Sequence, residues 1–223
     1  MNIKSYFLLS ILILTFTACS KNTVEANAQP TAHYNKPSKD ELAQLNRAYF
    51  ASGCFWCVEA IFESVKGVAE VHSGYSGGRA KNANYSAVSS GSTRHAESVE
   101  VFYDPQVVSY NTLLKVFFGS HDPTTFNQQG PDRGPQYRSA IFYQNDKEKS
   151  EIAAYIKELT TNKVFNGKIT TEVSPLDQFY MAEDYHQDYE RLHPNQSYVR
   201  AVSIPRLRRF QAKFPEILKG KTH

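Results

Sequence analysis

Apolar and polar residues follow two different periods along the chain after residue 40. Arg47–Ala51 is a short, mostly apolar run that is consistent with a strand, and Val68–Tyr75 is expected to be a second strand that ends at Ser76-Gly77-Gly78. Between them, the apolar residues of Phe55–Val65 recur at helical spacing, which predicts a helix. Ser52 and Gly53 interrupt the pattern, so a strand is expected to turn directly into that helix.

The rest of the chain continues this alternation. Glu97–Tyr103 alternates glutamate with valine in the manner of a half-buried strand, and Ser109 is placed to cap a helix over Tyr110–Phe118. His121–Pro135 has prolines and glycines near its end and is expected to be a loop. Further elements are expected as follows: a strand at Tyr137–Tyr143, a helix at Lys147–Leu159, a strand at Ile169–Val173, a short helix at Glu183–Leu192 and a helix from Pro205 to Leu218.

This order of elements indicates an α+β fold. We expect a two-layer α/β sandwich in which a ferredoxin-like mixed sheet is flanked by helices. The order alone leaves the pairing of the strands open. The length of 223 residues fits one globular domain preceded by a tail.

The N-terminal segment has the pattern of a targeting signal. Lys4 precedes the apolar run Tyr6–Leu14, which is too short to cross a bilayer as a mature helix. We therefore expect a signal peptide over residues 1–18. Residues 19–40 are mostly polar and lack an apolar period, which predicts a flexible linker, with the folded domain at 41–223.

Cys19 follows a small residue, Ala18, in a sequence that resembles the bacterial lipobox, although Phe16 stands where leucine is usual. The resemblance implies cleavage before Cys19 and a diacylglycerol on its sulfur. We expect an exported protein anchored to a bacterial membrane on its periplasmic or cell-surface side. Ser20, which is not aspartate, favours the outer membrane. Ordinary signal cleavage, which would leave a soluble secreted protein, is the alternative.

Charge and cysteine content exclude several classes of protein. The chain has 25 basic and 22 acidic residues, a formal charge of +3, and no dominant basic run, so a nucleic-acid partner is not expected. Its three cysteines are too few for a small secreted disulfide scaffold.

Cys54 and Cys57 form a CxxC pair at the start of the helix predicted over Phe55–Val65. The positive end of the helix dipole favours a thiolate at Cys54. The pair can form a disulfide if the first helical turn adjusts. Structural zinc usually takes four ligands; no second CxxC exists and the histidines lack a matching spacing, so we expect no metal.

The CxxC stretch belongs to a set of ordered motifs that resembles the peptide methionine sulfoxide reductase A family. The resemblance covers roughly residues 45–200 and rests on these stretches: Gly53-Cys54-Phe55-Trp56-Cys57-Val58-Glu59-Ala60, Gly74-Tyr75-Ser76-Gly77-Gly78, Asn84-Tyr85, Gly91-Ser92-Thr93-Arg94-His95-Ala96-Glu97, His121-Asp122-Pro123-Thr124, Gly134-Pro135-Gln136-Tyr137-Arg138-Ser139 and Ala182-Glu183-Asp184-Tyr185-His186. Each motif alone is weak, whereas their joint order is specific.

The resemblance assigns a role to each candidate residue. Cys54 matches the nucleophile that attacks the sulfoxide sulfur, and Glu97 matches the acid that protonates the departing oxygen. A carboxyl in an apolar pocket has a raised pKa, so we expect Glu97 to be a neutral proton donor near pH 7. The remaining matches are Tyr85 and Tyr137 as hydroxyls that bind the oxygen, Phe55 and Trp56 as walls for the substrate methyl group, and Asp132 and His186 as further polar positions.

The resemblance also implies the rest of the cycle. Attack leaves a sulfenic acid on Cys54, which Cys57, the only other cysteine of the domain, is expected to resolve as a disulfide. Many relatives carry glycine at the position of Cys57 and use a C-terminal cysteine instead. Direct reduction of the sulfenic acid by an external thiol remains an alternative.

The expected partners follow from this cycle. Thioredoxin or a thioredoxin-like exported domain would reduce the disulfide, without a bound cofactor. The substrates would be peptide or free methionine (S)-sulfoxide, in oxidised exported proteins, and a monomer is expected. Two other classes are alternatives: a thioredoxin-like disulfide-exchange enzyme, which the CxxC alone supports, and a non-enzymatic surface binding protein.

Overall fold

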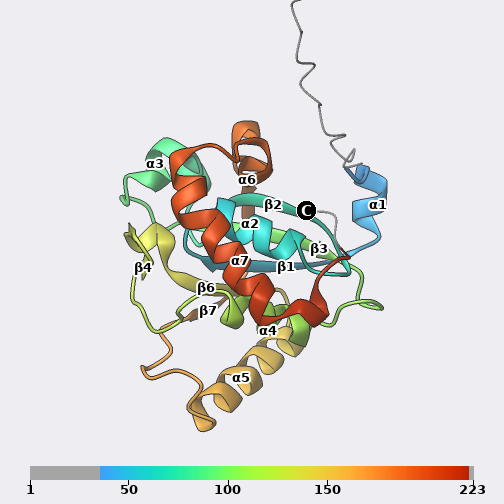
Figure 1. Cartoon of the computed structure of the whole chain (residues 1–223). Coiled ribbons are helices and arrows are strands. Elements are labelled where there is room, and N and C mark those ends of the chain that lie inside the picture. Colours follow the sequence, from blue (N-terminus) through green and yellow to red (C-terminus); the bar gives the residue numbers. More distant parts are fainter. Residues whose placement is uncertain (1–35, 221–223) are drawn as a thin grey trace, which may run out of the picture. The chain divides into compact units, whose positions relative to one another are not determined.

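A six-stranded mixed sheet forms the centre of the computed structural model, which describes residues 36–220 (Figure 1). Its order is β7-β6-β1-β3-β2-β8, and all neighbours are antiparallel except β6 and β7. The strands are β1 Asn46–Ser52, β2 Val68–Ser76, β3 Ala96–Tyr103, β6 Ser139–Tyr143, β7 Glu172–Pro175 and β8 Phe179–Met181. The expected signal peptide, Cys19 and most of the linker lie outside the described residues.

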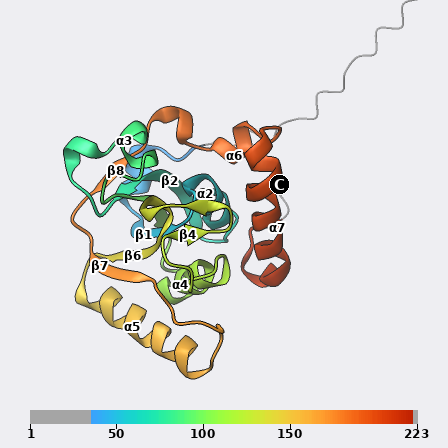
Figure 2. The same ribbon diagram turned by 90° about the vertical axis from the view of Figure 1, so that its left-hand side faces the viewer.

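Helices pack around this sheet, which confirms the α+β class (Figures 1 and 2). α2 lies against β2 and β3, α7 lies against α2, and α5 lies against α4. The helices are α1 Lys39–Ala43, α2 Phe55–Glu63, α3 Tyr85–Ser89, α4 Tyr110–Gly119, α5 Asp146–Thr161, α6 Tyr189–Leu192 and α7 Ile204–Lys213. None of the helices within residues 36–220 is both long and apolar enough to cross a membrane.

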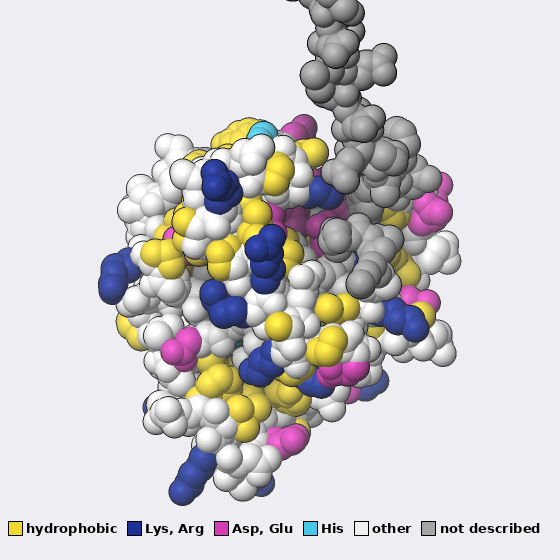
Figure 3. Space-filling model, viewed as in Figure 1, with side chains coloured by type: hydrophobic (Ala, Val, Ile, Leu, Met, Phe, Trp, Pro, Cys, Tyr) yellow, Lys and Arg dark blue, Asp and Glu magenta, His cyan; other side chains and the backbone are white. Residues whose placement is uncertain are grey.

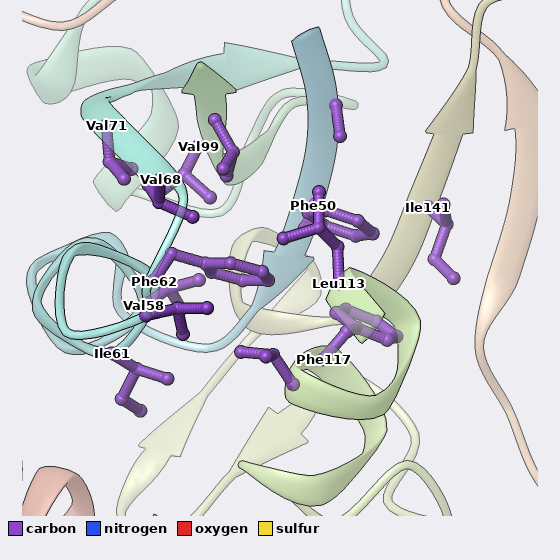
Figure 4. Close-up of a cluster of buried hydrophobic side chains, with 14 of the residues drawn as sticks. Phe50, Val58, Ile61, Phe62, Val68, Val71, Val99, Leu113, Phe117 and Ile141 are labelled. Carbon is purple, nitrogen blue, oxygen red and sulfur yellow. The ribbon is translucent and has the colours of Figure 1, made fainter. Parts of the chain in front are cut away.

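The main core lies between the sheet and helices α2 and α4, where aromatic side chains interlock (Figure 4). Phe50 of β1 stacks on Phe62 of α2 at 4.9 Å between ring centroids and on Phe117 of α4 at 5.3 Å. All three rings are fully buried. Burial of each such side chain contributes about 1.5–3 kcal/mol, so this cluster fixes α2, and with it the CxxC pair, against the sheet.

Strand β3 differs from its expected half-buried pattern because every one of its residues is buried. Its odd-numbered residues, including Val99 and Val101, join the main core, and β1 and β2 flank it on both sides. Glu97 shares the face of Val99 and therefore points toward α2 and the core. Glu100, on the other face, accepts a hydrogen bond of 2.7 Å from the hydroxyl of Tyr49.

Several expected boundaries are wrong. Tyr137 lies in a 3-10 turn, Pro135–Tyr137, because the proline begins a turn before strand β6. The loop expected at His121–Pro135 contains a short hairpin formed by β4 Gln128–Gln129 and β5 Asp132–Arg133. The strand expected at Ile169–Val173 is shifted to β7, where its parallel pairing with β6 sets the register.

The C-terminal third also departs from the local pattern. The helix expected at Glu183–Leu192 is divided into a 3-10 turn, Asp184–His186, and α6, because Asp188 has a left-handed backbone with φ 56°. The last helix ends at Lys213, before Pro215. The sequence patterns also did not predict α1, α3, β8 or a π-helical turn at Val199–Ser203.

Candidate active site

Cys54 lies at the turn between β1 and α2, where it is the N-cap residue of the helix and 6% exposed. Gly53 before it has φ +96°, a conformation that side chains rarely adopt. The Cys54 carbonyl accepts from the backbone N–H groups of Cys57 and Val58 at 3.2 and 3.3 Å. The chain reversal thus places the Cys54 sulfur at the N-terminal end of α2.

The two cysteines are free thiols whose side chains hydrogen-bond to each other. Burial raises the pKa of the Cys54 thiol well above its usual range. The hydrogen bond with Cys54 lowers the pKa of Cys57, and Arg206, Ser203 and Tyr198 contribute in the same direction. Burial therefore disfavours the anion on Cys54, whereas the surrounding hydrogen bonds and Arg206 favour it on Cys57.

Glu97 of β3 is 2% exposed and reaches the start of α2. Its Oε2 accepts from the backbone N–H of Phe55 at 3.1 Å, so it satisfies one of the unpaired amides of the first helical turn. Burial raises the pKa of Glu97 to about 8, although this hydrogen bond acts in the opposite direction. The carboxyl is therefore predominantly protonated at neutral pH and can donate a proton next to Cys54.

Tyr85 and Tyr137 bring two hydroxyls to the same place from different elements. Tyr85 begins α3, and its backbone N–H donates to Glu183 Oε1 at 3.0 Å, whereas Tyr137 ends the turn before β6. Burial raises the pKa of both phenols, and the nearby charges of Glu97 and Cys54 raise it further. Both hydroxyls therefore keep their protons and are available as hydrogen-bond donors.

Phe55 and Trp56 form an aromatic wall that other rings hold in place. Phe55 is 1% exposed, and its ring centroid lies 5.0 Å from that of His186. The Trp56 ring stacks on Tyr189 at 3.8 Å with an interplanar angle of 8°, and its Nε1–H donates to His186 Nδ1 at 3.1 Å. Burial lowers the pKa of His186, so its imidazole is neutral and serves as this acceptor.

Asp132 is connected to Cys57 by Tyr198, a residue that the sequence patterns did not predict as part of the site. The Tyr198 hydroxyl donates to Asp132 Oδ2 at 2.6 Å and lies 3.8 Å from the Cys57 sulfur. Tyr189 and Arg206 were also missed. No local pattern marks these residues, because they lie on segments far from the CxxC pair in sequence and reach it only in the folded chain.

A group of carboxylates elsewhere in the described chain has the spacing of metal ligands. Glu63, Glu70 and Asp188 offer oxygen atoms within 4.8 Å of one another. The Lys36 ammonium lies 3.2 Å from Glu70 and 3.6 Å from Asp188, so a side-chain cation already balances part of this charge. None of these residues contacts the cysteine pair through a hydrogen bond or ion pair that we observe in residues 36–220.

Comparison with known proteins agrees with this arrangement. A family model of peptide methionine sulfoxide reductase matches residues 46–218. The chain is 50% identical over 177 residues to peptide methionine sulfoxide reductase MsrA 2 of Synechocystis sp., which covers 79% of this chain and 83% of that protein. It is 41% identical over 193 residues to MsrA of Deinococcus radiodurans, which covers 86% of this chain and 94% of that protein.

Solved structures agree as well. Methionine sulfoxide reductase A of Corynebacterium diphtheriae superposes with a TM-score of 0.63 at 33% identity, over 76% of this chain and 84% of that one. Mxr1 from Saccharomyces cerevisiae in its reduced form gives a TM-score of 0.63 at 34% identity, over 68% of this chain and 87% of that one. The chain therefore belongs to the peptide methionine sulfoxide reductase family and is an enzyme that reduces methionine sulfoxide.

Proposed function

We propose that Cys54 reduces the S epimer of methionine sulfoxide, with Cys57 as the resolving cysteine. The observation that carries the proposal is the position of a protonated carboxyl, Glu97, at the same helix terminus as the Cys54 thiol. Two phenol hydroxyls and an aromatic wall surround the same point. This set supplies a nucleophile, an acid and oxygen-binding donors for a sulfoxide.

In the first step, the Cys54 proton passes to the hydrogen-bonded Cys57 thiolate, and the Cys54 sulfur attacks the sulfoxide sulfur. Glu97 protonates the oxygen as the bond between the substrate's sulfur and oxygen breaks. Positioned acids of this kind contribute about 10²–10⁴-fold in rate. The oxygen forms a bond to the Cys54 sulfur while its bond to the substrate sulfur and the bond between the two sulfurs break, so that a sulfenic acid remains on Cys54 and the thioether of methionine leaves.

Hydrogen bonds orient the substrate during this step. The Tyr85 and Tyr137 hydroxyls donate to the sulfoxide oxygen, where negative charge develops. Phe55 and Trp56 hold the substrate's methyl group, and His186 fixes the Trp56 ring through its indole N–H. Asp132 orients Tyr198 beside Cys57.

In the second step, Cys57 attacks the sulfur of the Cys54 sulfenic acid. The sulfur–oxygen bond breaks, water leaves, and a Cys54–Cys57 disulfide forms. The mutual hydrogen bond of the two side chains supports this pairing. A thioredoxin-like exported dithiol then supplies two electrons and returns both thiols, so that the cycle uses no bound cofactor.

The cellular setting is a separate proposal, carried by the sequence of residues 1–40. Cleavage before Cys19 and lipidation of its sulfur would anchor the domain outside the cytoplasm, where it would repair oxidised methionine in exported proteins. Mass spectrometry of the mature N-terminal peptide from membranes is expected to find a lipid-modified Cys19. Cys19→Ser should release active enzyme from the membrane; an unmodified N-terminus in the native host would contradict the anchor.

The catalytic assignment is tested by a single turnover without reductant. The mature chain, mixed with each epimer of a methionine sulfoxide peptide, is expected to form one equivalent of methionine from the S epimer and a Cys54–Cys57 disulfide. Cys54→Ser should abolish both products. Cys57→Ser should still form methionine and leave a sulfenic acid that dimedone captures.

Two outcomes would overturn these assignments. Turnover of the R epimer alone would reject the substrate. Loss of the first turnover in Cys57→Ser, with the fold retained by circular dichroism, would show that Cys57 is more than a resolving cysteine.

A further inference from the structure

Cys57 must lose a proton from its sulfur between the two steps of the proposed cycle. It receives the proton of Cys54 in the first step and must lose it again to attack the sulfenic acid as a thiolate. The residue is only 1% exposed, so water has no direct access to its sulfur. The proton must therefore leave through a hydrogen-bonding neighbour.

The π-helical turn at Val199–Ser203 places one such neighbour beside the sulfur. Ser203 is fully buried, and its hydroxyl hydrogen-bonds to the Cys57 side chain, where it stabilises the thiolate. Turns of this kind are rare and occur frequently at functional sites. Here the turn comes directly before α7, so that Ser203 faces the first turn of α2.

The same Ser203 hydroxyl also donates to Glu190 Oε2 of α6. A hydroxyl has one hydrogen and two acceptor positions, so it can receive a proton from one partner while giving its own to the other. Glu190 is 8% exposed, and burial raises its pKa to about 7, against the hydrogen bond from Ser203. Its carboxyl therefore exchanges protons readily near neutral pH.

Glu190 also lines a cavity of about 410 Å³ between α2, α6 and α7. None of the residues that we assign to the substrate pocket lines this cavity. Figure 3 shows acidic side chains gathered beside basic ones over this part of the surface. The cavity is only partly enclosed, so it gives the Glu190 carboxyl a way to exchange protons with solvent away from the substrate.

We propose that Ser203 and Glu190 form a proton relay that serves the resolving cysteine. The inference rests on the proposed function, because it requires that Cys57 form the disulfide. In the relay, the proton on the Cys57 sulfur moves to the Ser203 oxygen while the Ser203 proton moves to Glu190. The two end states, a thiol with a carboxylate and a thiolate with a carboxylic acid, hold the same number of protons.

In the resolving step, the Cys57 thiolate forms a bond to the Cys54 sulfur and the sulfur–oxygen bond of the sulfenic acid breaks. The hydroxide that leaves takes up a proton from solvent and becomes water. Glu190 retains the proton that Cys57 lost and releases it through the cavity. When an external dithiol later reduces the disulfide, the same path can return a proton to Cys57.

Charged groups around Glu190 influence whether Glu190 or Cys57 carries the negative charge in the relay. Arg206 of α7 lies near both Glu190 and Cys57 and stabilises their anions, and its guanidinium is held by Ser120 O at 3.0 Å and Ser52 Oγ at 3.2 Å. Around the cavity, the charged residues are Glu59 and Glu63 of α2, Asp188, Arg191 of α6 and Arg208 of α7. Arg206 acts as a positioning residue, because it makes no bond to the reacting sulfurs.

The test is a rapid-quench single turnover of the mature chain with the S epimer, in which methionine and disulfide are measured separately from pH 6 to pH 9. Glu190→Gln and Ser203→Ala are expected to slow disulfide formation at pH 7 at least tenfold, within the range of acid–base catalysis, and to slow methionine formation much less. At pH 9, hydroxide removes the Cys57 proton and the difference should narrow to about twofold. Ser203→Thr keeps a hydroxyl and should restore the pH 7 rate.

Glu63→Gln provides the matched control, because its carboxyl lines the same cavity without contacting Ser203. It should leave disulfide formation unchanged. Unaltered pH 7 rates in both Glu190→Gln and Ser203→Ala would overturn the relay, as would a defect confined to Tyr198→Phe, which would assign the proton to Asp132. Absence of the disulfide in the wild type would instead reject the proposed function itself.

Discussion

At the scale of single residues, strand β3 places Glu97 and Glu100 on opposite faces of the sheet, where their carboxyls have different neighbours. Glu100 lies on the face where Tyr49 donates to it and the Arg47 guanidinium lies 3.5 Å away, so its charge is balanced. Glu97 lies on the core face, and within residues 36–220 its side chain accepts a hydrogen bond only from the backbone N–H of Phe55. The position of Glu97 within the pleat therefore buries its carboxyl, and this burial raises its pKa.

Glu97→Gln is expected to slow methionine formation by about 10²–10³-fold, because the amide cannot give up a proton as an acid does. The protonated form is the active one. Because the pKa of Glu97 is about 8, the wild-type rate should fall as pH rises through 8. Single-turnover rates from pH 6 to 10 measure this. A variant with the wild-type rate, or with the same alkaline decline, would contradict the role of Glu97.

His186 holds Trp56 by accepting its indole N–H, and His186→Phe leaves that donor unpaired. Loss of a buried hydrogen bond costs about 1–3 kcal/mol, so we expect KM to rise about tenfold with a smaller change in kcat. His186→Gln offers an acceptor oxygen and should recover most of the affinity. Steady-state kinetics with the S epimer would decide; equal KM values for both variants would argue against this contact.

At the scale of elements, the hairpin of β4 and β5 closes over the turn between β1 and α2. A Cβ atom at Gly53 would lie 2.8 Å from the Cβ of Gln129 in β4, and its φ of +96° is unfavourable for any other residue. The hairpin also carries Asp132 in β5. The geometry of the cysteine turn and the position of Asp132 are therefore linked through this one contact.

Gly53→Ala is expected to lower the free energy of unfolding by about 1–3 kcal/mol and to reduce turnover, because the hairpin must move. Gly130→Ala is the matched control: it lies in the same hairpin with φ +56°, and a Cβ there meets nothing within 4 Å. Urea unfolding and turnover of both variants test the idea. Full activity in Gly53→Ala would show that the hairpin adapts without cost to the site.

At the scale of the whole molecule, buried carboxyls set the dependence of stability on pH. Burial, together with the charges of Asp188 and Glu70, raises the pKa of Glu63 to about 8, and its Oε1 has no hydrogen-bond partner among the described residues. Glu97 has a similar value. A carboxyl with a raised pKa in the folded state contributes stability that is complete below its unfolded value near 4.5 and is lost as pH rises through 8.

The free energy of unfolding should therefore decrease from pH 5 to pH 8. Glu63→Gln should reduce this decrease by about 1–3 kcal/mol, since a neutral amide removes one ionisation that opposes folding. Denaturant titrations of both proteins at pH 5 and pH 8 provide the measurement. Glu41→Gln, at the exposed start of α1, is a control expected to leave the decrease intact; an unchanged slope in Glu63→Gln would contradict the assignment.

The sequence predicts helices and strands correctly where the local residue pattern and the tertiary packing favour the same element. The strand before Gly53, the helix after Cys54 and the helix capped by Ser109 all match their patterns. The predicted boundaries are wrong where strand pairing or an unusual backbone conformation sets them. β7 takes its register from β6, and α6 begins only after Asp188, whose backbone is left-handed.

The two alternative functions, a disulfide-exchange enzyme and a binding protein, are wrong, because the chain belongs to the reductase family.

By itself, the sequence determined the family, the CxxC pair and the candidate acid, because ordered motifs and the helix-start position of Cys54 are properties of the linear chain. Tertiary structure decided the directions in which the pKa values of the two cysteines shift and the identity of their neighbours. Arg206, Ser203, Tyr198 and Glu190 approach Cys57 from segments more than a hundred residues away, and only burial in the folded chain gives their charges and hydroxyls effect. Electrostatic interaction depends on distance and solvent exclusion, and neither is written in residue order.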